Sequence, residues 1–160
     1  MSDLEPTPSN DRELVLSRVF AIPASSLFRC WTEPGLLTQW WSPKPWETPS
    51  ATLDVRPGGT GTIVMRAPDG AEFPNTGVYL EVVQDRKIVL TDAYVDAWTH
   101  SAKPFMTVTI TFDDLGGGRT RYTARVGHWT VEDRESHEKR GFHQGWGVCA
   151  DQLAEVAGRL

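Results

Sequence analysis

Apolar and polar positions divide the first third of the chain into one strand and two short helices. Residues 13–22 are rich in apolar and β-branched side chains and stop at Pro23, which predicts a strand. Pro23 is suited to a first helical turn. Leu27, Phe28 and Trp31 follow it at helical spacing, so a short helix is predicted there.

A second short helix is predicted directly after the first. Thr32 is its candidate N-cap, and Pro34 stands near its start. Its apolar side would consist of Leu36, Leu37, Trp40 and Trp41. The prolines within residues 43–49 exclude further helix and indicate a stiff loop around Trp46.

Nearly every segment between residues 51 and 128 has the composition or the two-residue period of a β-strand. Turns rich in glycine, proline and aspartate separate these segments. The predicted strands cover residues 51–55, 61–67, 73–83, 86–95, 105–113 and 119–128. The turns are too short for a crossover connection, so antiparallel pairing is expected.

The apolar period changes to three or four residues after His128. Thr130 and Asp133 fit a capping box at the start of a helix. The apolar stripe that follows consists of Phe142, Trp146, Cys149, Leu153, Val156 and Leu160. This pattern predicts one helix of about seven turns over residues 130–160, with its stripe against the sheet.

These elements predict an α+β fold. A curved antiparallel sheet of about six to seven strands would grip the long C-terminal helix, with two short helices after the first strand. Residues 1–12 hold few apolar side chains and are predicted to be a disordered lead-in, while residues 13–160 form a single domain. A bent sheet around a helix leaves a groove, and function is expected there.

Composition narrows the classes of function. The net charge of −5 and the pI near 5.3 argue against a nucleic-acid-binding surface. No stretch approaches the roughly 20 apolar residues of a membrane span, and the polar start is unlike a signal peptide. Cys30 and Cys149 are the only cysteines, so we expect a cytoplasmic protein without a disulfide framework.

Motifs for cofactor, metal or nucleophilic chemistry are missing from the sequence. Residues 57–61 lack the Gly-Lys-Ser/Thr of a phosphate loop, and no Gly-x-Ser-x-Gly elbow occurs. His137, His143 and Cys149 are six residues apart, which places successive members on different helix faces. We therefore expect no cofactor, no metal and no assigned catalytic residue. The charged residues within 132–140 are interpreted as a solvated helix face.

Strand parity predicts which side chains face the groove. With Arg66, Lys87 and Arg121 turned to solvent, the alternate residues face inwards. Most of these are apolar, but four polar residues stand among them: Asp92, Tyr94, Tyr122 and His128. They serve either as hydrogen-bonded core residues or as groups that orient a ligand in an apolar pocket.

The same reasoning gives the apolar wall of a candidate ligand site. Its predicted members are Trp41, Trp46, Met65, Met106, Phe142 and Trp146. The tryptophans have an alternative role as core residues that plug the groove. Gly141, Gly145 and Gly147 each cost a helix about 0.8–1 kcal/mol relative to alanine. They indicate either close helix–sheet packing or space left for a ligand.

Several short motifs, taken in order, carry a family resemblance. They are Arg18-Val-Phe-Ala-Ile-Pro23, Trp31-Thr-Glu-Pro34, Trp40-Trp41-Ser-Pro43, Arg56-Pro-Gly-Gly59, Pro68-Asp-Gly70, Gly77-Val-Tyr-Leu-Glu-Val-Val83 and Gly145-Trp146. With these motifs the chain from about residue 14 to 160 resembles the helix-grip (START/Bet v 1-like, SRPBCC) superfamily. Within it, the chain is most similar to the branch named for the C-terminal domain of the activator of Hsp90 ATPase.

The resemblance implies a pocket between sheet and helix that holds a hydrophobic or aromatic small molecule. Some relatives act as polyketide cyclases or aromatases, and His128, with Asp92 or a tyrosine, would then be the acid–base group. A third alternative is a chaperone- or protein-interaction module, and a homodimer anchored by exposed tryptophans is compatible with each. The eukaryotic activator uses a separate N-terminal domain, which the twelve residues before the first strand lead us to expect is absent here.

Overall fold

The computed structural model describes residues 5–160, and its main element is a seven-stranded antiparallel sheet. The strands lie in the order β1-β9-β8-β5-β4-β3-β2. Their bounds are β1 (Glu13–Phe20), β2 (Glu47–Leu53), β3 (Thr60–Arg66), β4 (Glu72–Val83), β5 (Lys87–Thr91), β8 (Met106–Gly116) and β9 (Arg119–His128). A separate hairpin pairs β6 (Tyr94–Asp96) with β7 (Thr99–His100).

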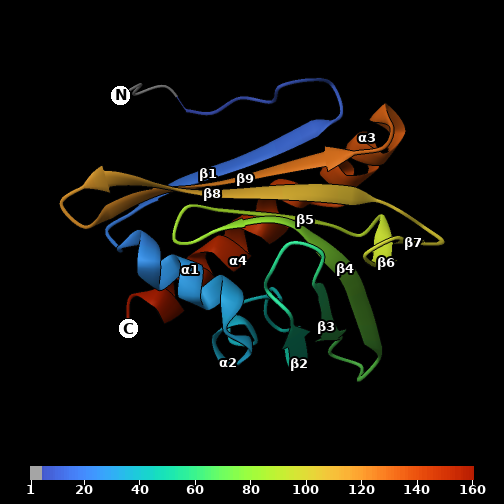
Figure 1. Ribbon diagram of the computed structural model, residues 1–160, viewed down its shortest axis with the longest axis horizontal. Coiled ribbons are helices and arrows are strands. Elements are labelled where there is room, and N and C mark those ends of the chain that lie inside the picture. Colours follow the sequence, from blue (N-terminus) through green and yellow to red (C-terminus); the bar gives the residue numbers. More distant parts are fainter. Residues whose placement is uncertain (1–4) are drawn as a thin grey trace.

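Helices cover one face of this sheet. They are α1 (Ala24–Thr32), α2 (Pro34–Leu37), α3 (Val131–Lys139) and α4 (Phe142–Ala157). Figure 1 shows α4 running beneath the sheet, with α1 and α2 at one end and α3 at the other. The predicted α+β class is therefore confirmed, with a curved antiparallel sheet, two short helices after β1 and a long C-terminal helix. No helix in residues 5–160 is long and apolar enough to cross a membrane.

The core lies between α1, α4 and the β1-β9-β8-β5 side of the sheet. Inward residues of these strands alternate with outward ones, as the parity predicts, and Ile88, Ile110 and Ala124 are fully buried. Leu27 of α1 and Leu153 of α4 cover them from the other side and are also fully buried. Each such aliphatic side chain contributes about 1.5–3 kcal/mol through its removal from water.

The single helix predicted over residues 130–160 is wrong, because the chain breaks into α3 and α4. Thr130 does cap α3, since its side chain accepts a hydrogen bond from the Asp133 N–H at 3.0 Å. Gly141 then adopts a φ of +97°, in the left-handed region that ends a helix and that glycine tolerates best. The apolar stripe of α4 begins at the next residue, Phe142, which is buried.

The predicted strand 86–95 also ends early, at Thr91. The Thr91 hydroxyl accepts a hydrogen bond from the Ala93 N–H at 3.2 Å, and Asp92 Oδ1 accepts the N–H groups of Phe105 and Met106 at 2.8 and 3.0 Å. These side-chain bonds replace the backbone ladder and turn the chain away from the sheet. Tyr94 therefore lies in the β6–β7 hairpin.

Two further boundaries differ from the prediction. The second helix is a single turn with Glu33 at its N-cap, and the Thr32 hydroxyl instead donates to the Phe28 carbonyl at 2.9 Å. At the other boundary β2 begins at Glu47, inside the predicted loop. Pro49 is tolerated in β2 because this is an edge strand whose register shifts between Glu47 and Ser50.

Residues 7–12 of the predicted lead-in run along the outer edge of the sheet beside β1. The Arg125 guanidinium donates to the Thr7 carbonyl at 3.0 Å, and Arg134 donates to the Asp11 carbonyl at 2.9 Å. Residues 1–4 lie outside the described part. The disorder of residues 1–12 stays a prediction.

Candidate functional site

A cavity of about 340 Å³ lies between α4 and the concave face of the sheet, which fits the size range of small-molecule pockets. Its lining is mostly apolar, and most of it comes from the following elements. Strands β3 and β4 supply Ile63, Met65, Val78 and Tyr79. Strands β8 and β9 supply Met106, Val108 and Tyr122, α1 and the following turns supply Trp31, Trp40 and Trp41, and α4 supplies Phe142, Gly145, Trp146 and Cys149.

Most of the candidate ligand-binding residues meet at this cavity. Those that line it are Trp41, Met65, Asp92, Met106, Tyr122, Phe142 and Trp146. They come from six separate elements or turns, so strand parity and the helical stripe converge on one space. The structure thus brings them together, and their contact with a ligand stays a proposal.

The remaining three candidates lie elsewhere. Trp46 packs on Phe73 with ring centroids 5.8 Å apart, over a separate surface depression beside β2. Tyr94 stacks on His100 at 5.2 Å within the β6–β7 hairpin, because β5 ends before it. His128 is buried beneath α3, outside the cavity lining.

The three tryptophans at the α1 end form one aromatic cluster with divided roles. Ring centroids are 5.0 Å apart for Trp31–Trp40 and 5.3 Å apart for Trp31–Trp41. Trp40 is a core residue, and its indole donates to the Cys30 carbonyl at 2.9 Å. Trp41 remains half-buried because one face borders the cavity. Trp40 thus has the core role, and the ligand-binding role of Trp41 stays a prediction.

Gln152 of α4 fixes this cluster against the helix. Its side-chain N–H group donates to the carbonyls of Trp40 and Ser42 at 2.9 and 2.8 Å, and its oxygen accepts the Lys44 N–H at 3.2 Å. A loop whose backbone groups are satisfied in this way forms a preorganised wall.

The helix glycines have three different causes. Gly141 is required by its positive φ. At Gly147 an added Cβ would meet the Arg18 guanidinium at 3.0 Å, so packing is close there. At Gly145, which lines the cavity, an added Cβ would meet no atom within 4 Å. The sequence left two explanations for these glycines. Gly145 lies beside open space at the cavity, and Gly147 lies in a closely packed contact.

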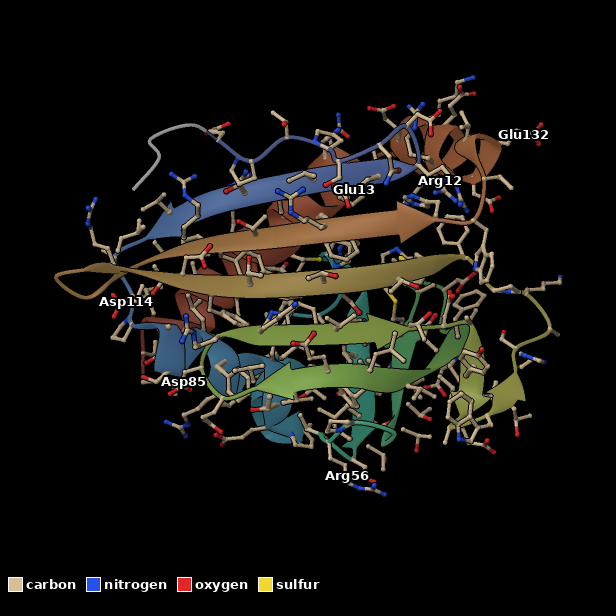
Figure 2. All side chains as sticks on the ribbon, turned by 45° about the horizontal axis from the view of Figure 1, so that its top comes forward. Arg12, Glu13, Arg56, Asp85, Asp114 and Glu132 are labelled. Atoms are coloured by element: carbon tan, nitrogen blue, oxygen red, sulfur yellow. The ribbon has the colours of Figure 1, made fainter. Side chains whose placement is uncertain are left out.

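A histidine pair closes the α3 end of the site, and sequence reasoning missed one member. His128 Nδ1 lies 2.8 Å from the Arg12 carbonyl, and His128 Nε2 lies 2.9 Å from His137 Nδ1. A carbonyl only accepts, so His128 Nδ1 carries a hydrogen. With both rings neutral, His137 Nδ1 then donates to His128 Nε2. Figure 2 shows Arg12 at the end of the sheet next to α3, opposite the turns marked by Asp85 and Asp114.

His137 lines the cavity and is half-buried, so the interpretation of residues 132–140 as a solvated face is wrong for this residue, whereas Arg140 borders the cavity and remains exposed. The His137 ring packs between Phe105 and Phe142, with centroids 5.2 and 5.1 Å away. Burial, followed by the charges of His128 and Arg140, lowers the pKa of His137 to about 4. The polar composition of α3 concealed this residue, and only its approach to β9 places it inside.

Two buried tyrosines belong to the cavity lining, and Tyr79 is the one that sequence reasoning missed. Tyr79 and Tyr122 are 6% and 2% exposed, and both line the cavity from opposite parts of the sheet. Burial, followed by the Asp54 charge, raises the pKa of Tyr79 to about 12, and burial raises the pKa of Tyr122 further. A register shift in β4 just after Tyr79 interrupts the regular alternation of the strand.

Neither cysteine has the environment of a nucleophile. Burial raises the pKa of Cys30 to about 11 and that of Cys149 to about 12, so both remain thiols at neutral pH. Cys149 Sγ donates to the Trp41 carbonyl at 3.3 Å. Within residues 5–160 no three His, Cys, Asp or Glu side chains gather in a group suited to a metal ion.

Known structures share this architecture over nearly the whole chain. A protein from Nitrosomonas europaea is 39% identical, with a TM-score of 0.89 over 93% of this chain and 96% of that one. A protein from Rhodobacter sphaeroides is 20% identical, with a TM-score of 0.83 over 96% and 97%. An AHSA1-like protein from Aeromonas hydrophila is 17% identical, with a TM-score of 0.67 over 91% and 93%. The last two show the fold alone.

Sequence comparison places the chain in a family. A search of curated protein sequences finds no match. Residues 21–158, however, match the family described as "Activator of Hsp90 ATPase homolog 1-like protein". Proteins of this fold generally bind small hydrophobic ligands. The chain belongs to the activator of Hsp90 ATPase homolog 1-like family.

Proposed function

We propose that this protein binds a hydrophobic or aromatic small molecule in the cavity between the curved sheet and α4. The observation that carries this proposal is the open, mostly apolar space beside Gly145. A few polar groups, Tyr79 and Tyr122 among them, converge on an otherwise aromatic and aliphatic wall. This combination is the usual form of a small-molecule site.

The composition of α4 supports the proposal energetically. Gly145 lies inside a helix, where alanine would be more favourable by about 0.8–1 kcal/mol. Since an added Cβ meets nothing there, neither backbone conformation nor packing requires glycine. Space for a ligand is the remaining physical reason to leave this position without a side chain.

A matched pair of variants tests this function with diphenylmethane, an aromatic hydrocarbon without hydrogen-bonding groups, as the probe. Titration of the wild-type protein is expected to change tryptophan fluorescence saturably, because Trp31, Trp41 and Trp146 border the cavity. Gly145→Leu fills the space and is expected to weaken binding by at least about tenfold, which corresponds to about 1.4 kcal/mol. Gln144→Leu adds the same side chain at an exposed neighbouring position and is expected to bind normally.

Thermal melts of both variants show whether they are folded. Absence of saturable binding by the wild type, or equal binding by Gly145→Leu and wild type, would refute the cavity as a binding site for apolar aromatic molecules.

The enzymatic alternative is not proposed, because its acid–base group is unavailable. Both ring nitrogens of His128 are held, by the Arg12 carbonyl and by His137, and His128 does not line the cavity. Cytoplasmic location, homodimer formation and chaperone binding stay predictions of the sequence.

A further inference from the structure

The Tyr122 hydroxyl is a polar group inside the cavity with unused hydrogen-bonding capacity. Tyr122 is 2% exposed and makes no side-chain hydrogen bond of ordinary geometry to any residue from 5 to 160. Its hydroxyl is nevertheless not among the polar atoms sealed off from solvent. Tyr122 is also one of the residues that line the cavity. Tyr79, 6% exposed, meets the same description from β4.

The Trp31 indole is a neighbouring donor that can use only the oxygen of the Tyr122 hydroxyl. Trp31 Nε1 is fully buried and has no hydrogen-bond partner of ordinary geometry within the described residues. The indole N–H only donates, and it lies near enough to the Tyr122 oxygen to lower the pKa of that hydroxyl against the larger effect of burial. A tyrosine oxygen that accepts from an indole N–H still has its own hydrogen to donate to another acceptor.

Several other polar groups of the lining already form hydrogen bonds. Asp92 Oδ1 accepts two backbone N–H groups, and the Thr91 hydroxyl bonds the Thr107 hydroxyl at 2.9 Å. The Cys149 thiol donates to the Trp41 carbonyl. On the β4 and β9 walls, the phenolic O–H groups of Tyr79 and Tyr122 donate no hydrogen bond to any residue from 5 to 160, so each has a donor available.

We propose that the ligand carries a carbonyl oxygen. This oxygen accepts a hydrogen bond from the Tyr122 hydroxyl, and the Tyr79 hydroxyl is a second, weaker donor to it. This inference rests on the proposed function and narrows it to aromatic carbonyl compounds. A buried donor without a partner is costly, so a ligand that supplies an acceptor is preferred over one of equal size that does not. Tyr122 is thus the residue that sets specificity, and the apolar wall supplies the general affinity.

Two probes of similar shape separate these contributions. Benzophenone carries a carbonyl where diphenylmethane carries a methylene group, and both are titrated against wild type, Tyr122→Phe, Tyr79→Phe and Tyr94→Phe. Tyr122→Phe is expected to weaken benzophenone binding roughly tenfold, because the buried carbonyl loses its donor, and to leave diphenylmethane binding within about twofold. Tyr79→Phe is expected to shift benzophenone in the same direction by about two- to fivefold. Tyr94→Phe removes a hydroxyl outside the cavity and is the matched control.

The possible results distinguish a failure of carbonyl recognition from a failure of small-molecule binding itself. Tyr122→Phe retains the ring that packs on Phe20 and Phe112, at 5.9 and 6.0 Å, and a thermal melt checks its fold. If both probes bind but neither Tyr122→Phe nor Tyr79→Phe changes their ratio, carbonyl recognition is refuted and apolar binding stands. If neither probe binds the wild type, the proposed function fails for aromatic molecules of this size.

Discussion

The two halves of the sheet have similar sequence patterns but pack differently against the helices. On the β1-β9-β8-β5 side, inward residues such as Ile88 and Ile110 are fully buried against α1 and α4. On the β4-β3-β2 side, Met65 remains half-buried and faces the cavity. The difference lies in the helix opposite each side, since α4 presents Leu153 to the core but Gly145 to the cavity. The same helix therefore packs tightly at Leu153 and leaves a cavity at Gly145, and the cavity borders residues of β8 and β9 as well as β3 and β4.

The sharpest test of this comparison is truncation on each side. Ile110→Ala removes a fully buried side chain from the closed side and is expected to cost about 2–5 kcal/mol of unfolding free energy. Met65→Ala enlarges a space that is already open, so it is expected to cost about 1 kcal/mol or less. Urea unfolding of the two variants measures both losses. Equal losses would show that the cavity side is packed as tightly as the core.

A second test uses two glycines at the ends of the same helix turn. Gly141→Ala forces an L-residue into a φ of +97° and is expected to destabilise the protein by about 1–2 kcal/mol. Gly145→Ala adds a methyl group to open space in a helix and is expected to stabilise the protein by up to about 1 kcal/mol. Chemical denaturation gives both values. A destabilising Gly145→Ala would mean that the cavity wall approaches this position in solution.

A third test is the pH dependence of stability at the histidine end of the cavity. The pKa of His137 is lowered in the folded protein from 6.5 to about 4, so the unfolded chain takes up a proton first as the pH falls. The stability that neutral His137 provides is complete above pH 6.5 and is lost as the pH falls from 6.5 towards 4. His137→Asn retains a donor for His128 and is expected to lose less stability across this range than the wild type.

The measurement compares urea midpoints at pH 7.5 and 4.5, with His143→Asn as an exposed control on the neighbouring helix. Equal losses in wild type and His137→Asn would assign the pH dependence to other groups.

Local chemistry made much of the fold predictable. Two-residue alternation identifies β3, β8 and β9, and Thr130 identifies the start of α3, because these signals lie within a few residues of each other. The break at Gly141 and the end of β5 at Thr91 were missed for a different reason. At Gly141 the local sequence is compatible with a continuous helix or with a helix end, and at Thr91 it is compatible with a strand or with a turn. The surrounding structure selects one conformation in each case.

The site divides in the same way. The sequence by itself determined the α+β fold, the inward faces of the strands, and an apolar stripe with Phe142 and Trp146, since side-chain direction follows from local period. Only the tertiary structure decided that Tyr79 and His137 enter the cavity while Tyr94 and Trp46 do not. Those placements arise from a register shift in β4, the early end of β5 and the docking of α3 on β9. These placements depend on contacts between segments that are far apart in the chain. The periodicity of apolar residues along the sequence does not predict such contacts.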